Sequence, residues 1–175
     1  MMGALAGQNI PRPVKFCYWV DCGNLLAGEY PRSLDEQASI EKMRALRQAG
    51  IEIFIDLTSK EDGLNTYEHF LDGAQRLNYP IRDVSVPEKP DQMINILDAI
   101  DLHLGKGRKV YVHCWGGIGR TGVVVGCWLA RHNGGGKNGL ALLQELWKDN
   151  PKSALRDSTE TPEQIKYVLH WPAGK

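Results

Sequence analysis

One stretch of the sequence, residues 109–129, restricts the fold and the chemistry of this chain more than any other. It reads KVYVHCWGGIGRTGVVVGCWL: a β-rich apolar run ends before Cys114, three glycines follow, and an apolar helical run begins at Arg120. Gly116, Gly117 and Gly119 allow the backbone to curl tightly. The pattern predicts a strand, a compact loop and a helix in direct succession.

The loop between this strand and this helix is expected to bind an anion. Unpaired backbone amides at the first turn of a helix and the helix dipole both place partial positive charge there. Cys114 precedes the turn and Arg120 opens the helix, so a bound anion would lie against a thiol and a guanidinium. Thiols beside cations at helix N-termini ionise readily. We therefore interpret the loop as a phosphate-binding site with Cys114 as nucleophile.

The loop glycines also fit the G-x-G-x-x-G fingerprint of dinucleotide-binding domains. That fingerprint usually opens its domain and requires an acidic residue about 20 positions later, near a second strand. Here the loop lies two-thirds along the chain, Leu142 occupies the acidic position, and Glu145 falls in a helical pattern. The dinucleotide hypothesis also gives no role to Cys114 or Arg120, and a Walker-type loop is excluded because no Lys-Ser/Thr pair follows the glycines.

Residues 113–122 resemble the signature loop of the cysteine-dependent protein tyrosine and dual-specificity phosphatases, which reads His-Cys, five residues, Arg, then Ser or Thr. The resemblance implies that Cys114 attacks phosphorus and forms a cysteinyl-phosphate intermediate. Arg120 would hold two phosphate oxygens with its planar fork. Thr121 would donate its hydroxyl to the leaving sulfur, and His113 would orient the loop by hydrogen bonding to its backbone.

The rest of the loop is expected to bind phosphate mainly through its backbone. The phosphate-binding residues are predicted to be Trp115, Gly116, Gly117, Ile118, Gly119 and Arg120. Residues 115–119 contain no Lys or His, unlike the basic loops of relatives that act on phosphoinositides and polyphosphorylated inositols. This difference disfavours a polyanionic substrate, although Arg82, Lys89 or Arg156 could supply charge from elsewhere.

The leaving group requires a proton donor from another segment. Asp83 is the favoured candidate, because it is expected near the carboxyl end of the strand predicted over residues 79–86 and before a proline-bounded loop. In dual-specificity phosphatases an aspartate in a similar segment, about as far before the cysteine, has this role, and YPIRD at 79–83 resembles that segment. The same carboxylate would then activate the hydrolytic water. Glu88 and Asp91 are alternatives.

Gln164 and Asp56 occupy positions that matter in some relatives. Gln164 resembles a glutamine that positions water, but the spacing of Thr161 and Gln164 is also that of a capping box at the start of a helix, which we favour. Asp56 stands where some relatives carry a second cysteine that can form a disulfide with the nucleophile. This departure argues against redox protection of that kind.

The remaining pattern predicts a single α/β domain over residues 1–175, with a largely parallel sheet of about five strands flanked by helices, as in the phosphotyrosine phosphatases. Strands are expected at 14–20, 25–30, 51–57, 79–86 and 108–112, and helices at 33–49, 67–77, 93–104, 122–132, 140–150 and 161–170. The first helix is expected to begin with a capping box of Ser33 and Glu36. Residues 1–12 are expected to form a flexible N-terminal segment.

Composition narrows the classes of function. Lys plus Arg and Asp plus Glu both number 21, so no net field attracts nucleic acid or an anionic membrane. No apolar stretch is long enough to span a bilayer, and no secretory leader is recognisable. The 4 cysteines and 5 histidines lack disulfide or metal-ligand spacing. We expect a cytoplasmic, monomeric enzyme without metal or cofactor.

Three classes of function fit the loop. The first is a phosphatase of phosphotyrosine, phosphoserine and phosphothreonine in proteins; phosphoinositides, inositol phosphates and RNA 5′-phosphates are alternative phosphomonoester substrates on the same fold. The second is a phosphate-binding module with slow turnover. The third, sulfur or arsenate redox transfer, lacks a resolving cysteine near the loop.

Overall fold

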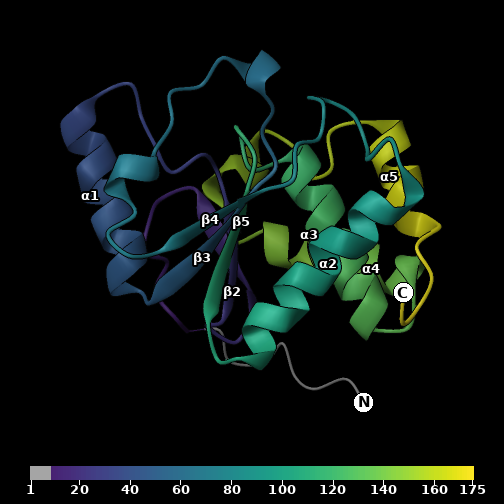
Figure 1. Ribbon diagram of the computed structural model, residues 1–175. Helices are drawn as coiled ribbons and strands as arrows, with labels where there is room; N and C mark the ends of the chain where they lie inside the picture. The colour runs from purple at the N-terminus through teal and green to yellow at the C-terminus, as the bar shows by residue number, and fades with distance from the viewer. Residues whose placement is uncertain (1–8) are drawn as a thin grey trace.

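The computed structural model describes residues 9–175 and shows a sheet between two layers of helices (Figure 1). The strands are β1 (Cys17–Asp21), β2 (Leu25–Gly28), β3 (Ile51–Asp56), β4 (Gln75–Asn78) and β5 (Lys109–His113), in the spatial order β1-β2-β5-β3-β4. β1 pairs antiparallel with β2, and the other three pairings are parallel. The predicted α/β class and largely parallel sheet are thereby confirmed.

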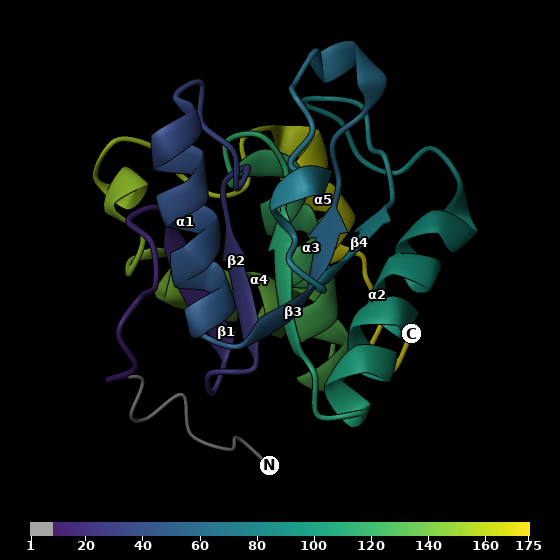
Figure 2. The same ribbon diagram turned by 60° about the vertical axis from the view of Figure 1, so that its left-hand side comes forward.

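The helices divide unequally between the two faces of the sheet. They are α1 (Glu36–Gln48), α2 (Pro90–Gly105), α3 (Gly119–His132), α4 (Gly136–Trp147) and α5 (Pro162–Leu169), with 3-10 turns η1 (Lys60–Asp62), η2 (Glu68–Phe70) and η3 (Pro151–Ala154). Figures 1 and 2 show α1 on one face and α2 to α5 on the other. The central strand β5 contributes side chains to the core on both faces of the sheet. Val110 and Val112 pack on the side of α2 to α5, and Tyr111 packs on the side of α1.

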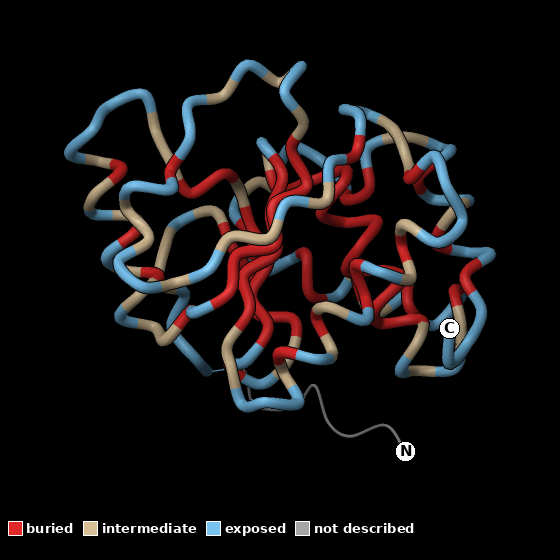
Figure 3. The backbone as a smooth tube through the Cα atoms, viewed as in Figure 1, coloured by how far each residue is buried: buried red, intermediate tan, exposed pale blue. Residues whose placement is uncertain are grey.

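Burial is greatest in the sheet and in the helix that follows β5 (Figure 3). Every residue of α3 from Gly119 to Ala130 is buried. A helix that is covered on all sides needs an apolar run rather than an apolar stripe, which explains the sequence of α3. Its closest neighbour is α4: a Cβ on Gly139 would lie 2.5 Å from the carbonyl oxygen of Gly126. The two backbones therefore touch.

Two predicted elements are wrong. Residues 67–77, predicted as a helix, form η2 and then β4, because Asp72 and Gly73 adopt positive φ angles of 45° and 83° that a helix does not allow. Residues 79–86, predicted as a strand, form turns and irregular backbone. The edge strand β4 reads QRLN, which carries almost no β signal, so the predicted strand lies one segment too late in the chain.

The start of α1 differs from the prediction, and the N-terminal segment is described only in part. α1 begins at Glu36, and its N-cap is Asp35 rather than Ser33, because the Asp35 carboxylate accepts a hydrogen bond from Ala38 N at 2.7 Å. Of the expected flexible segment 1–12, residues 1–8 lie outside the described part of the chain. Pro11 accepts a hydrogen bond at its carbonyl from Trp19 Nε1 at 3.2 Å.

A separate finding concerns membranes. Within residues 9–175, no helix combines the length and the apolar character that crossing a bilayer demands.

Replacing Gly139 by alanine is expected to lower the free energy of unfolding by roughly 1–3 kcal/mol, because the new methyl group would overlap the α3 backbone. Urea denaturation measures the effect. Gly105→Ala is the matched control: a Cβ there meets nothing within 4 Å, so this helix-end variant should be neutral or slightly more stable. Equal destabilisation by both variants would contradict the contact between α3 and α4.

Candidate active site

The predicted phosphate-binding loop connects β5 to α3 at the carboxyl edge of the sheet (Figure 1). Cys114 is 3% exposed, and its Sγ accepts a hydrogen bond from the backbone N–H of Gly117 at 3.3 Å. Gly117 has a φ of 72°, and a Cβ there would lie 2.4 Å from the backbone of Gly28 in β2. Glycine is therefore required at position 117 both for backbone conformation and for space.

His113 holds the start of the loop. Its Nδ1 lies 3.1 Å from the carbonyl oxygen of Cys114, and its Nε2 lies 2.8 Å from the hydroxyl of Tyr67. Burial lowers the pKa of His113 below its usual value, so the ring is neutral. A neutral ring that donates from Nδ1 to the carbonyl accepts at Nε2 from Tyr67. This is the geometry that the predicted orienting role requires.

Asp56 lies at the end of β3, beside His113. Its carboxylate accepts hydrogen bonds from the Thr58 amide at 2.8 Å, from the Thr58 hydroxyl at 2.6 Å and from Arg76 Nε at 2.8 Å. Burial raises the pKa of Asp56, but the hydrogen bonds from Thr58 and Arg76 oppose it, and the pKa is lowered overall. The position that carries a cysteine in some relatives thus holds an ionised carboxylate that ties β3 to β4.

Arg120 is buried in the first turn of α3, with 1% of its side chain exposed. Nη1 and Nη2 bind the two oxygens of Asp62 at 2.8 and 3.0 Å. Nη1 also donates to the carbonyl oxygen of Ile81 at 3.1 Å, and Nη2 lies 3.1 Å from Asp83 Oδ1. The guanidinium has one further N–H, on Nε, which is buried and has no hydrogen-bond partner among the described residues.

Asp62 is the site residue that sequence reasoning missed. Its side chain is 3% exposed, and one carboxylate oxygen also accepts a hydrogen bond from Ser59 N at 2.7 Å. Burial opposes ionisation, but Arg120 and Ser59 together lower the pKa of Asp62. The spacing of Ser59 and Asp62 is a capping pattern visible in the sequence, yet it marks only a local turn. Nothing in it indicates a contact with Arg120, 58 positions away.

Asp83 lies in a turn after β4, not in a strand as predicted. Its side chain is 52% exposed and approaches Arg120 from the solvent side. Val84, the next residue, has a φ of 52°, which is rare for a β-branched residue. The alternative acids Glu88 and Asp91 are exposed, and neither pairs with Arg120 in the described part of the chain. Of these three carboxylates, Asp83 is thus the one that contacts Arg120.

Gln164 forms the predicted capping box at the start of α5. Its Oε1 accepts a hydrogen bond from Thr161 N at 3.2 Å, and Thr161 Oγ1 accepts one from Gln164 N at 3.1 Å. Its Nε2 donates to the carbonyl oxygen of Ser85 at 3.1 Å. The same side chain also meets the loop, because a Cβ on Gly119 would lie 3.0 Å from that Nε2. Gln164 therefore ties α5 to the turn that carries Asp83.

The other predicted loop residues differ in exposure. Trp115 is 58% exposed at the surface, whereas the side chain of Ile118 is 7% exposed. Thr121 is fully buried, and its hydroxyl has no hydrogen-bond partner in residues 9–175. The expected bond from Thr121 to the Cys114 sulfur is therefore not formed in this conformation.

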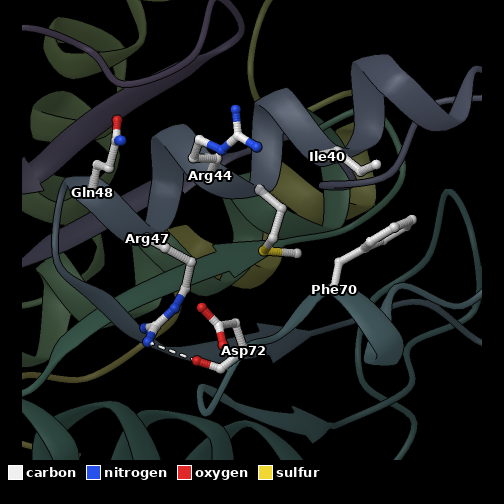
Figure 4. A pocket seen from close by; sticks show the side chains of 7 residues that line it. Ile40, Arg44, Arg47, Gln48, Phe70 and Asp72 are labelled. Carbon is white, nitrogen blue, oxygen red and sulfur yellow. Dashed lines mark hydrogen bonds between the residues drawn. The ribbon is translucent and has the colours of Figure 1, made fainter.

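A hollow of about 440 Å³ lies elsewhere, between α1 on one side and η2 with the turn after it on the other (Figure 4). Arg47 of α1 donates across it to the carbonyl oxygen of Asp72 at 3.2 Å. None of its lining residues belongs to the Cys114 loop. In the described residues, no three His, Cys, Asp or Glu side chains are grouped so as to hold a metal ion.

Comparison with known sequences places the chain among phosphatases. A family model described as "Polymorphic toxin system, DSP-PTPase phosphatase" matches residues 29–134. "Putative tyrosine phosphatase 067L" of Invertebrate iridescent virus 3 is 36% identical over 96 residues, which are 53% of this chain and 39% of that protein. "Putative tyrosine phosphatase 197R" of Invertebrate iridescent virus 6 is 27% identical over 99% of this chain and 59% of that protein. The chain thus spans about half the length of these relatives.

Solved structures share the fold. Tk-PTP in its active form has a TM-score of 0.63 and 25% identity, over 87% of this chain and 92% of that one. PTPMT1 in complex with PI(5)P has a TM-score of 0.69 and 17% identity, over 88% and 92%. The human tyrosine phosphatase-like serine/threonine/tyrosine-interacting protein has a TM-score of 0.66 and 18% identity, over 89% and 94%. The last two likenesses are to the fold alone.

Asp62→Asn is expected to lower the free energy of unfolding at pH 7 by about 3 kcal/mol, because removal of one partner leaves the buried Arg120 charge unbalanced. Urea denaturation provides the measurement. Asp98→Asn is the matched control, since Asp98 pairs with Arg131 at 2.9 Å but is 63% exposed, and the loss should stay below about 1 kcal/mol.

The pH dependence of this difference has a defined sign. The pKa of Asp62 is lower in the folded chain than its ordinary value of 3.8, so the ionised carboxylate stabilises the fold at higher pH. That stabilisation disappears as the pH falls through the lowered pKa. The gap in stability between the unmodified protein and Asp62→Asn should be constant from about pH 5 to 7 and shrink below about pH 4. A gap that widened in acid would contradict the ion pair.

Proposed function

Because this chain belongs to the dual-specificity phosphatase (DSP-PTPase) family, we propose that it hydrolyses phosphomonoesters in proteins, with Cys114 as nucleophile. Phosphotyrosine is the first expected substrate, with phosphoserine and phosphothreonine beside it. The viral relatives that carry the name tyrosine phosphatase support this choice.

The observation that carries the proposal is a pair of buried polar groups without partners beside Cys114. Arg120 Nε and Thr121 Oγ1 have no hydrogen bond within residues 9–175, although buried polar groups in folded proteins nearly always have one. Both belong to the first turn of α3, next to the loop amides. A phosphate oxygen would satisfy the Arg120 donor. The Thr121 hydroxyl makes no bond to the Cys114 sulfur in this conformation, and in the proposed reaction it would donate to that sulfur as the thiolate leaves.

Arg120 would grip the phosphate along one side of its fork. Asp62 occupies one N–H on each terminal nitrogen, so the side formed by Nε and Nη2 is the one that faces a ligand once Asp83 releases Nη2. A two-pronged contact with phosphate oxygens is the preferred geometry of a guanidinium. The contact with Asp83 is the exposed one of the two, and it is the easier to exchange. Binding of the phosphate would therefore free Asp83.

Two chemical steps follow from this arrangement. In the first, Cys114 Sγ forms a bond to phosphorus, the bond from phosphorus to the leaving oxygen breaks, and protonated Asp83 gives its proton to that oxygen. In the second, water attacks the phosphorus, passes a proton to the Asp83 carboxylate, and Cys114 leaves as a thiolate next to the Thr121 hydroxyl. The loop amides and Arg120 balance the charge on the phosphoryl oxygens in both steps.

Two alternatives have an observation in their favour. A phosphoinositide substrate is suggested by the complex of PTPMT1 with PI(5)P, but the uncharged side chains of residues 115–119 favour a less anionic phosphate here. A phosphate-binding module with slow turnover is suggested by the close hold of Asp62 on Arg120, which an incoming phosphate must share. Turnover separates the binding module from the proposal, and a comparison of substrates separates the phosphoinositide alternative from it.

The direct test is hydrolysis of p-nitrophenyl phosphate in the presence of EDTA. We expect activity without added metal, and activity that requires metal would contradict a cysteine mechanism. Phosphopeptides, an RNA 5′-phosphate and an inositol phosphate assayed side by side then identify the preferred substrate class.

Replacement of Cys114 by serine should abolish turnover while binding of a phosphate ligand persists, because a serine hydroxyl is not ionised at neutral pH. Steady-state kinetics and calorimetric titration with orthophosphate measure the two effects. Cys127→Ser, at a buried position in α3, is the control for loss of a thiol and should retain activity if it folds. Continued hydrolysis by the Cys114 variant would assign the nucleophile elsewhere.

Asp83→Asn should slow hydrolysis of an alkyl or phenyl phosphate by about 10²–10⁴-fold, because the leaving oxygen then departs without a proton. With p-nitrophenyl phosphate, whose leaving group needs less assistance, the loss should be smaller. Asp91→Asn is the matched control, since Asp91 is an exposed carboxylate at the start of α2. Equal effects on both leaving groups would remove Asp83 from the role of acid, and a large loss in the Asp91 variant would assign that role there.

A further inference from the structure

The peptide unit between Gly116 and Gly117 carries the amide that faces the nucleophile. On one side, Gly117 N–H donates to Cys114 Sγ at 3.3 Å. On the other side, the carbonyl oxygen of Gly116 accepts a hydrogen bond from Lys152 Nζ at 2.8 Å. In a trans peptide the C=O and N–H bonds point in opposite directions. A contact that fixes the carbonyl therefore also fixes the direction of the amide.

This peptide unit needs a restraint from outside the loop. It joins two glycines, which lack the Cβ atoms that limit backbone rotation elsewhere. If the unit rotated by half a turn, the partial negative charge of the Gly116 oxygen would face the Cys114 thiolate and the phosphate oxygens. Both the thiolate and a bound phosphate would then be destabilised.

Lys152 is well placed to supply the restraint. It lies in η3, where its backbone N–H donates to the Asn150 side chain at 3.0 Å. Its ammonium group also binds Glu29 Oε2 at 2.9 Å and lies 4.9 Å from the centre of the Phe16 ring. Glu29 in turn binds Lys42 of α1 at 2.8 Å. The long side chain is thereby held in one geometry, so little freedom remains to be lost when it binds the loop.

The neighbouring peptide units of the loop are held in the same way, but by neutral donors. His113 Nδ1 lies at the Cys114 carbonyl, Tyr30 N donates to the Trp115 carbonyl at 2.9 Å, and Ser158 Oγ donates to the Ile118 carbonyl at 2.7 Å. Among these four donors, Lys152 alone carries a charge. Its hydrogen bond to the loop is therefore charge-assisted and stronger than those of the neutral donors.

We propose that Lys152 is a positioning residue of the phosphate loop, which holds the Gly116 carbonyl outward and so keeps the Gly117 amide directed at Cys114. This inference rests on the proposed role of Cys114 as a thiolate nucleophile. Lys152 lies outside residues 29–134, the part of the chain that the family model matches. The segment between α4 and α5 thus completes the site from beyond the matched part.

Of the other titratable groups near Cys114, one is charged and three are neutral. Arg120 of α3 interacts with the thiol as a cation. Tyr18 of β1 and Tyr111 of β5 are buried, and burial raises the pKa of both hydroxyls far above neutrality, so they stay uncharged. His113 is neutral as well. These groups do not change when Lys152 is replaced, so they form a constant background for the test.

The test measures alkylation of Cys114 by iodoacetamide as a function of pH, with mass spectrometry to distinguish it from the exposed Cys22. Lys152→Met keeps an unbranched side chain that is one atom shorter, and it removes the charge and the donor. The pH midpoint of alkylation should rise by about one unit, which corresponds to a tenfold weaker preference for the thiolate. Inhibition of p-nitrophenyl phosphate hydrolysis by orthophosphate should weaken about tenfold. Lys152→Arg should restore the pH midpoint to within about half a unit and the inhibition by orthophosphate to within about threefold. A guanidinium also donates to a carbonyl.

Lys148→Met is the matched control from the same segment. Lys148 is 67% exposed and pairs with Glu145 at 2.7 Å, so its removal should leave the midpoint unchanged. Glu29→Gln keeps Lys152 but removes the carboxylate that holds it, and should shift the midpoint in the same direction by a smaller amount. If Lys152→Met does not fold, as judged by circular dichroism, the Glu29 variant decides.

The outcomes are distinct. The proposal is overturned if Lys152→Met folds and its alkylation midpoint is unchanged. It is also overturned if Lys148→Met shifts the midpoint by the same amount, or if Glu29→Gln shows no shift when that variant decides. A shift in the alkylation midpoint of a protein that hydrolyses no phosphate would leave the role of Lys152 intact and overturn the proposed function instead.

Discussion

The site depends on one buried cation. A guanidinium taken out of water must be paired, because an isolated buried charge is strongly destabilising. Asp62 from η1, the Ile81 carbonyl and Asp83 from the turn after β4 meet this demand at Arg120. Segments that are distant in sequence are thereby drawn to the first turn of α3. The charge that would bind phosphate also assembles the rim around it.

The loop itself is shaped by close backbone contacts as much as by charge. Gly117 passes within contact distance of Gly28 in β2, and Gly139 of α4 touches the backbone of α3. These approaches hold the loop and the helix after it against elements that are themselves buried. Close packing of this kind leaves little room for adjustment, so Cys114 and the N-terminus of α3 keep a fixed relation.

Local features were predictable from the sequence and distant ones were not. The strand, loop and helix around Cys114 are contiguous, and the capping box of Thr161 and Gln164 is a four-residue pattern. Both can therefore be recognised from a short stretch of sequence. Asp62 and Lys152 reach the site across 58 and 36 positions, and no periodicity encodes such contacts. The false helix at 67–77 arose because its apolar side chains, spaced like those of a helix, pack against the α1 side of the sheet through a turn.

The turn that carries Asp83 is pinned on both sides, two residues before and two residues after the carboxylate. Arg120 binds the Ile81 carbonyl, and Gln164 binds the Ser85 carbonyl. A half-exposed side chain between such pins can swing by rotamer changes within picoseconds to nanoseconds, whereas hinged lids move in microseconds to milliseconds. Movement of this carboxylate is thus a matter of side-chain torsion and does not depend on slow closure of the backbone.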